Sequence, residues 1–237
     1  MSVSLVFLTY NRAAVTAQSL VFNLANAGDT WDEVVWVDNG STDGVRDFMF
    51  TLNPSVAVLH SENLGVAKGY NHGFLLSKSD WIVTIGVDRI MPDGWLKLFK
   101  KYATEIENTG VFVLFSQPLN RVSERLYTKP GEALVKVVND LSIIEAMPIG
   151  AKIIGKWVFK KVGYFREDLG LYGYSDVDWS WRCRKAGVLT YTVPDVLCKH
   201  LGDTDSREYI LFKGQEANLS WNILKENPKD YYNPYAE

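Results

Sequence analysis

The first half of the chain alternates short apolar runs with longer stretches of helical periodicity. The apolar runs are rich in branched side chains and predict strands at residues 3–10, 33–38, 55–60, 80–86 and 110–117. The periodic stretches predict helices at residues 13–26, 44–52, 65–78 and 92–107, the last with a proline in its first turn. Strands separated by such helices need crossover connections. We therefore expect an α/β fold with a mostly parallel central sheet flanked by helices.

The second half is less regular. Residues 117–148 have no clear period, which is typical of a flap or an edge hairpin. Farther along, the pattern predicts helices at residues 151–163, 175–187 and 206–226, and a strand at residues 188–193. The tail from residue 227 is expected to be poorly ordered. We expect one domain at residues 1–203, with halves 1–116 and 117–203, followed by a C-terminal helical extension and tail at residues 204–237.

Composition and charge exclude several classes of protein. The 237 residues are 47% hydrophobic, which suits one large globular domain. No apolar run reaches the length of a membrane span, and the N-terminus lacks the features of a signal peptide. Cys183 and Cys198 make neither a disulfide framework nor a four-ligand zinc site, so we expect a cytoplasmic protein with reduced thiols. The net charge of −3 does not indicate nucleic acid or an anionic membrane as a partner.

Polar side chains follow the ends of the predicted strands. They are Thr9, Asn11, Asp38, Asn39 and Asp88. Because ligands of open parallel sheets bind beyond the carboxyl ends of the strands, this edge is the expected site.

The stretch "VVWVDNGSTDG" places Asp38 at a strand end, before a turn of small polar residues and a helix. A carboxylate at a strand end suits the hydrogen-bond donor groups of a nucleobase or ribose. The start of the following helix offers free N–H groups. An ordinary strand-to-helix turn with a Ser or Thr cap explains the same pattern equally well.

The stretch "ENLGVAKGYNHG" follows the third strand. Lys68 and Asn71 share one face of a predicted helix, opposite Val66, Tyr70 and Phe74. A cation and an amide at this place suit a diphosphate or a sugar. The alternative is a glycine-rich helix that packs close to the sheet and leaves the lysine in solvent.

The stretch "GYSDVDWSWRCRKAG" is the most informative. Ser175 is positioned to cap a helix that begins at Asp176, and Asp178 precedes Arg182 by four residues, so an ion pair explains Asp178. Asp176 has no such structural explanation. A carboxylate in the first turn is stabilised as an anion by the helix, and it can accept a proton from a substrate hydroxyl. The two tryptophans are more simply core or sheet-covering residues.

Taken together, the motifs resemble those of the inverting family-two glycosyltransferases, which have the GT-A fold, a single Rossmann-like domain. The matching stretches span roughly residues 3–200 in order. They are "FLTYNR", "VDNGSTDG", "ENLGVAKGYNHG", "VDRIMPDGWL", "GAKIIGKWVFKKVGYFRED", "YSDVDWSWRCRKAG" and "VPDVLCKH". Each motif alone is weak, but seven in register make chance an unconvincing explanation.

The resemblance implies a hexosyltransferase that uses a nucleotide sugar, such as a UDP-, GDP- or dTDP-sugar, with residues 1–116 binding the nucleotide and residues 117–203 the acceptor. It implies that Asp176 is the general base. It assigns donor binding to Thr9, Asn11, Arg12, Asp38, Asn63, Lys68, Asn71 and Asp88. It also implies a bound Mn²⁺ or Mg²⁺ at Asp88 and His200.

Two residues depart from the family pattern. Gly86 stands where the first carboxylate of the Asp-x-Asp element is usual, and Ser175 replaces the glutamate of a Glu-Asp pair. Mg²⁺ and Mn²⁺ need only one or two protein carboxylates when a diphosphate supplies other oxygens, so Asp88 with His200 is a possible, weaker metal site. The retained Asp176 leaves the proposed base in place.

Two alternatives stay open at this point. One is a metal-independent transferase of the same fold, with Lys68, His200 or Arg207 offsetting the diphosphate charge. The other is a non-catalytic protein that binds sugar nucleotides or glycans, since fold alone does not give function. The acceptor is a glycan, a lipid-linked sugar or another hydroxyl. The excess of lysine and arginine between Arg121 and Arg166 keeps a modified nucleic-acid base as a minority option, although a solvated surface explains it more simply.

Overall fold

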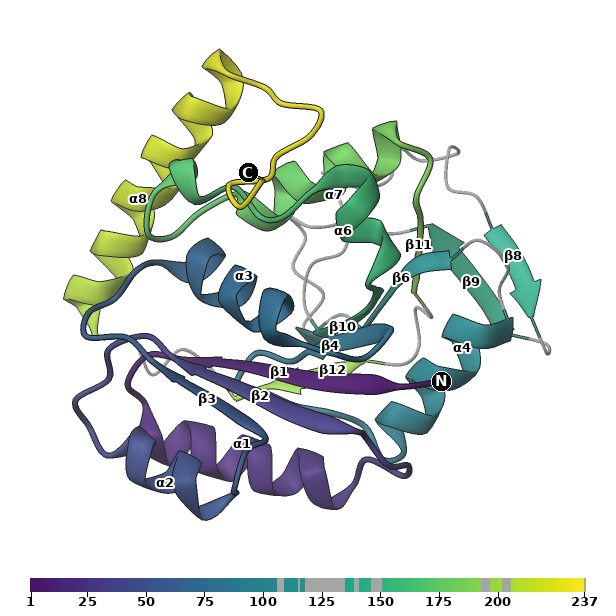
Figure 1. The fold of residues 1–237 in the computed structure, drawn as a ribbon, viewed down its shortest axis with the longest axis horizontal. Coiled ribbons are helices and arrows are strands. Elements are labelled where there is room, and N and C mark those ends of the chain that lie inside the picture. The colour runs from purple at the N-terminus through teal and green to yellow at the C-terminus, as the bar shows by residue number, and fades with distance from the viewer. Residues whose placement is uncertain are drawn as a thin grey trace.

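The computed structural model describes residues 1–105, 109–114, 116–117, 135–138, 141–145, 151–192, 197–201 and 206–236. Within these residues, nine strands form one sheet in the order β3-β2-β1-β4-β10-β6-β11-β9-β8, and three short strands form a second sheet in the order β5-β12-β7. Figure 1 shows helices on both sides of the large sheet. The predicted α/β fold is therefore confirmed.

The first half of the large sheet is parallel. It consists of β3 (Val56–Leu59), β2 (Glu33–Asp38), β1 (Val3–Thr9) and β4 (Trp81–Thr84). β1 pairs with both β2 and β4, and the register places Thr9 opposite Asp38. The carboxyl ends of these strands therefore meet at one edge of the sheet, where the sequence predicts the site.

The second half of the sheet mixes directions. It consists of β10 (Ala151–Gly155), β6 (Thr109–Leu114), β11 (Leu189–Thr192), β9 (Leu141–Glu145) and β8 (Val135–Val138). β10 runs antiparallel to both β4 and β6, whereas β11 is parallel to β6. β8 and β9 form an antiparallel pair at the sheet edge, which agrees with the expected edge hairpin. The other residues of the 117–148 stretch lie outside the described part of the chain.

The sequence pattern predicts a helix over residues 151–163, and this prediction is wrong for its first five residues. Ala151–Gly155 is a strand whose five residues are all buried, and the helix α6 covers only Trp157–Val162. A strand buried on both faces gives a continuous apolar run, which periodicity does not distinguish from a buried helix. The consequence is functional, because the strand brings Lys152 opposite Thr84 at the end of β4.

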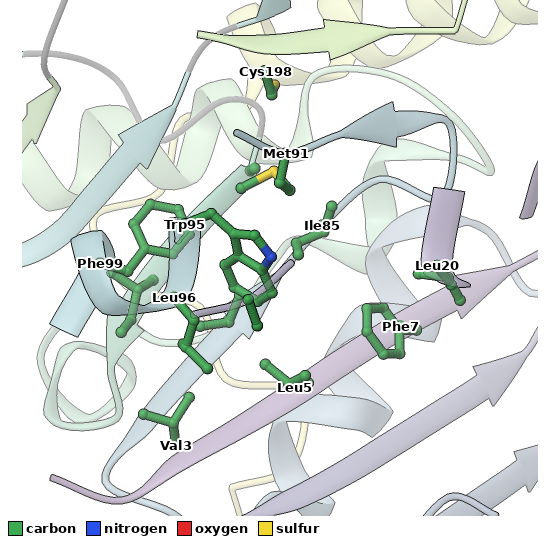
Figure 2. Packing of buried hydrophobic residues seen from close by; sticks show 14 of the residues in the cluster. Val3, Leu5, Phe7, Leu20, Ile85, Met91, Trp95, Leu96, Phe99 and Cys198 are labelled. Atoms are coloured by element: carbon green, nitrogen blue, oxygen red, sulfur yellow. The ribbon is translucent and has the colours of Figure 1, made fainter. Parts of the chain in front are cut away.

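Helices cover the two faces of the sheet with separate hydrophobic cores (Figure 1). One face carries α1 (Ala13–Ala25), α2 (Val45–Thr51) and α4 (Trp95–Glu105), and the other carries α3 (Val66–Leu76), α6 and α7 (Ser175–Lys185). Figure 2 shows Val3, Leu5 and Phe7 in a row along β1 beneath Trp95 of α4. Val6, between them in sequence, belongs to the opposite core, as the alternation of a strand requires.

The beginnings of two helices differ from the predictions. α4 begins at Trp95, whose N–H donates to Pro92 O (3.2 Å), so the proline lies in the turn before the helix. α7 begins at Ser175 itself and has no side-chain cap. The N–H of the preceding residue, Tyr174, donates to Ser220 Oγ (2.9 Å), so a contact with a distant helix holds the chain here instead of the predicted cap by Ser175.

The C-terminal residues form a long helix and an ordered tail. The helix α8 (Arg207–Glu226) lies where residues 206–226 were predicted as helix, and Ser206 caps it, since its Oγ accepts from Tyr209 N. The prediction of a poorly ordered tail is wrong. Tyr232 O accepts from Tyr164 N (2.7 Å), and Tyr235 Oη donates to Glu167 in the 3₁₀ helix η1 (Glu167–Leu169). The tail therefore folds back onto the domain (Figure 1). In the described part of the chain, no helix combines the length and apolar character of a membrane span.

Candidate active site

Asp38 at the end of β2 is buried and held by several donors. Thr9 Oγ1, on the neighbouring strand, lies 3.2 Å from its carboxylate, and Arg46 Nε donates to it at 2.6 Å. The N–H of Ser41 donates to it as well (3.0 Å). The structure thus brings together Thr9 and Asp38, as predicted, and adds Arg46, which sequence reasoning missed. Arg46 also donates to His60 O, so it ties the ends of β2 and β3 together.

Asn11 and Arg12 shape the loop that follows β1. Both have left-handed backbones, with φ of 55° and 67°, a conformation that non-glycine residues adopt rarely. The N–H of Asn11 donates to Ser41 Oγ (2.8 Å), and its Oδ1 accepts from Thr42 N (2.8 Å). Asn11 therefore joins two strand-end loops, and the turn directs Arg12 Nη1 to Asp88 Oδ2 (3.3 Å).

Asn63 lies in the loop between β3 and α3. Its Oδ1 accepts from Asn39 Nδ2 (2.7 Å) and from Gly65 N (3.0 Å). Gly65 has a φ of 88°, and a Cβ there would lie 2.9 Å from Leu171 Cα. The N–H of Val66 donates to Leu171 O (2.9 Å), so this loop packs directly on the segment that leads into α7.

The glycines of α3 are explained by packing. A Cβ on Gly69 would lie 2.5 Å from a methyl group of Leu8, and one on Gly73 would lie 2.5 Å from a methyl group of Val6. The helix therefore lies close to β1, as the alternative reading of this motif expected. Lys68 is half-buried. Burial lowers the pKa of the neighbouring His60, and the positive charge of Lys68 also acts to lower it.

Asn71 is buried and serves α3 as an anchor. Its Oδ1 accepts from Phe165 N (3.0 Å), and its Nδ2 donates to Phe165 O (2.8 Å) and to Glu167 (2.9 Å). The amide thus connects α3 to the segment before α7. Its assignment to the sugar side of the donor stays a prediction.

Asp88 and His200 are brought together, as the resemblance implies. Asp88 follows β4, and His200 ends β12 (Cys198–His200), which pairs with β5 (Arg89–Ile90). His200 Nε2 lies 3.3 Å from Asp88 Oδ2, and both side chains are partly exposed. The third strand of this small sheet is β7 (Ser116–Gln117). Asp88 and His200 are 112 residues apart in the chain, so only the fold brings them together.

The pair has donor atoms that fit a divalent metal. A carboxylate oxygen and an imidazole nitrogen suit Mn²⁺, and Mg²⁺ accepts one or two carboxylates when a diphosphate supplies further oxygens. Among the residues that the structure describes, no group of three or more His, Cys, Asp or Glu side chains is arranged to hold a metal. Asp88 and His200 therefore fit a metal whose remaining ligands come from substrate and water.

Asp176 and Asp178 lie two residues apart in α7 but have different surroundings. Asp178 is buried, lies 2.7 Å from Arg182 Nη2 and 3.8 Å from Arg166 Nη1, and is therefore a structural carboxylate. Asp176 is half-buried, and its carboxylate accepts from the N–H of Val177 (2.9 Å). Burial raises the pKa of Asp176, and the nearby cation of Lys152 opposes that rise.

Lys152 is a site residue that sequence reasoning missed. Burial lowers the pKa of its ammonium group to about 8, while the negative charge of Asp176 acts in the opposite direction. Because residues 151–163 are predicted as a helix, the sequence does not indicate that Lys152 lies at the edge of the sheet. Because β10 is antiparallel, its first residues lie beside the last residues of β4, so the lysine reaches the active edge.

Tyr70 shows that the separate parts form one site. Burial, together with the negative charges of Asp88 and Asp176, raises the pKa of its hydroxyl to about 12. The positive charge of Arg89 acts on this tyrosine and on Asp176. Asp88 and Asp176, which lie far apart in the chain, thus both act electrostatically on the same tyrosine, as does the cation of Arg89. This is an arrangement for an anionic substrate and a proton transfer.

Comparisons with known proteins agree with this arrangement. Residues 4–141 match the family model of glycosyl transferase family 2. The dTDP-rhamnosyl transferase RfbF of Shigella flexneri is 23% identical over 215 residues, which cover 84% of this chain and 69% of that protein. The mannosyltransferase PcManGT from Pyrobaculum calidifontis, solved with GDP-Man and Mn²⁺, superposes with a TM-score of 0.65 at 17% identity. GalNAc-T7, solved with UDP, GalNAc and Mn²⁺, gives a TM-score of 0.59 at 13% identity.

Coverage differs between these two structures. The alignments include 96% and 84% of this chain but only 65% and 44% of the respective structures. At such identities the likeness shows the GT-A fold, whereas the family match extends over more than half of the sequence. The chain therefore belongs to glycosyl transferase family 2, whose members are nucleotide-sugar-dependent glycosyltransferases.

Proposed function

We propose that this chain transfers a sugar from a nucleotide-sugar donor to an acceptor hydroxyl with inversion, using Asp176 as the general base. The observation that carries the proposal is the contrast within α7. Asp178 is engaged by two arginines, whereas Asp176 interacts electrostatically with the cation of Lys152 and, like Asp88, with Tyr70. Burial raises the pKa of Asp176, and a raised pKa makes a carboxylate a stronger proton acceptor, as a general base must be.

The proposed reaction is a single displacement at the anomeric carbon. The acceptor oxygen attacks this carbon from the face opposite the diphosphate, while Asp176 takes the hydroxyl proton. The bond between the sugar and the diphosphate breaks, and the nucleoside diphosphate leaves with its electron pair. Positive charge develops on the sugar ring as in glycoside hydrolysis, so an adjacent carboxylate also stabilises the transition state.

The donor is proposed to bind across the carboxyl edge of the sheet. Thr9, Asn11, Asp38 and Arg46 would contact the base and ribose, and Arg12, Asn63, Lys68 and Asn71 would line the diphosphate and sugar side. Asp88 and His200 would hold a Mn²⁺ or Mg²⁺ ion, which neutralises charge on a diphosphate when bound. A dTDP-sugar is the first donor to test, because the relative from Shigella flexneri is named as a dTDP-rhamnosyl transferase.

The test is an Asp176→Asn variant, which keeps the size of the side chain but removes the base. General-base catalysis contributes about 10²–10⁴-fold, so turnover should fall by that factor while donor binding stays nearly unchanged. Release of nucleoside diphosphate would be measured with dTDP-, UDP- and GDP-sugars and a panel of sugar acceptors. The exposed Asp47, replaced by Asn, is the matched control. Full activity of Asp176→Asn would disprove the assignment of the base.

A further inference from the structure

The glycine that replaces the first metal-site carboxylate lies directly against the Arg89 side chain. Gly86 does not have a positive φ, so its backbone conformation does not require glycine. A Cβ built at this position would lie 3.1 Å from Arg89 Nε, 3.4 Å from Arg89 Cδ and 3.1 Å from Asp88 Oδ1. At these distances an added Cβ would require the side chains of Arg89 and Asp88 to shift by a few tenths of an ångström. Gly86 therefore leaves the room that Arg89 fills.

The local backbone holds Arg89 in this place. Its N–H donates to Gly86 O (3.0 Å), which closes a tight turn, and the residue then enters β5 opposite His200 of β12. Its Nη1 approaches Cys198 Sγ at 4.0 Å. The turn and the strand pairing together direct the guanidinium across the glycine rather than away from the site.

The position of Arg89 changes the charge of the donor site. Where a first carboxylate would add a negative charge, this chain has a guanidinium, whose field reaches Asp176, Tyr70 and Lys152. With Arg12 beside Asp88, two arginines lie close to the expected diphosphate. Guanidinium groups bind phosphate oxygens through paired N–H donors, and they do so without a metal.

We propose that Arg89 binds the donor diphosphate in the space left by Gly86, and that it thereby supports nucleotide binding when no divalent metal is present. The proposal rests on the proposed function, since it places the diphosphate at the same strand end. It adds that Gly86 and Arg89 act as a pair. The glycine is then an adaptation of the site rather than a remnant of a damaged one.

The test is calorimetric binding of dTDP, UDP and GDP to the full chain, each with Mn²⁺ and with EDTA. In the unchanged protein, at least one nucleotide should bind in EDTA. Losing one charge-assisted hydrogen-bond pair should weaken that binding by about 10- to 100-fold in Arg89→Gln. Arg89→Lys keeps the charge and should recover part of the loss. The exposed Arg184, replaced by Gln, should have no effect.

A second variant tests whether Gly86 and Arg89 act as a pair, and it keeps the arginine in place. Gly86→Asp places a carboxylate against Arg89 and should abolish binding in EDTA while leaving binding in Mn²⁺. Thermal unfolding followed by circular dichroism shows whether each variant is folded. Unchanged EDTA binding in a folded Arg89→Gln, or absence of EDTA binding in the unchanged protein, would overturn the proposal for Arg89 alone. Absence of nucleotide binding under both conditions would overturn the proposed function as well.

Discussion

Replacing Lys152 with methionine should make the protein more stable and less active. The side chain is buried at the active edge, and burial lowers the pKa of its ammonium group from 10.5 to about 8. At about 1.4 kcal/mol for each pKa unit, keeping this charge buried at pH 7 costs about 3 kcal/mol of folding free energy. Methionine has a similar length and no charge, so it removes most of that cost.

The dependence on pH has a definite sign. Because the pKa of Lys152 is lower in the folded protein, the unfolded chain binds more protons between about pH 8 and pH 10.5. The cost is therefore fully present below about pH 8 and diminishes as the pH rises through this window. The difference in stability between the two proteins should shrink accordingly between pH 7 and pH 10.

The assay is urea denaturation at pH 7 and at pH 10. Since Asp176 loses a neighbouring cation in the Lys152→Met variant, the substitution is compared in an Asp176→Asn background, where that carboxylate is absent. Lys160 is exposed, and its replacement by methionine should change stability by less than about 0.5 kcal/mol. In the otherwise unchanged protein, Lys152→Met should also reduce sugar transfer, because the cation beside Asp176 is lost.

One result would refute this reasoning. If Lys152→Met/Asp176→Asn is no more stable than Asp176→Asn at pH 7, the ammonium group is fully compensated by its surroundings. Its position would then need no functional explanation. A clear gain in stability with a loss of activity would instead mark a residue kept for function at the expense of stability.

Three further variants test other parts of the structure. Asp178→Asn leaves Arg182 and Arg166 buried without their carboxylate. The free energy of unfolding, measured by urea titration, should fall by about 3–5 kcal/mol. A loss below about 1 kcal/mol would contradict the structural role of Asp178. Asp88→Asn should abolish the Mn²⁺-dependent part of nucleotide binding in calorimetry, and an unchanged metal effect would locate the metal elsewhere. Ile153→Ala opens a cavity in the buried strand β10 and should cost about 2–5 kcal/mol, whereas an exposed position would cost little.

Most of the first half of the fold was predictable from local patterns. The parallel strands and their helices follow the alternation of apolar runs and periodic stretches, and observed bounds such as Glu33–Asp38 equal the predicted ones. Polar residues after these strands were predictable as a site because parallel strands bring their carboxyl ends to one edge. Asp88, Asp176 and His200 were found through motifs, and the fold places charged groups from all three segments around one edge.

Sequence alone did not determine the residues whose roles depend on pairing between distant strands. Lys152 reaches the site only because β10 runs antiparallel between β4 and β6, and an apolar run carries no information about strand direction. The importance of Gly86 depends on Arg89 lying across it, which only the three-dimensional contacts show. The tail is ordered because Tyr232 and Tyr235 meet partners about 70 residues away in the chain, and no local pattern records such partners. The sequence thus determined the alternating elements of the first half and the chemistry available, whereas tertiary packing decided the strand β10 and which charges meet.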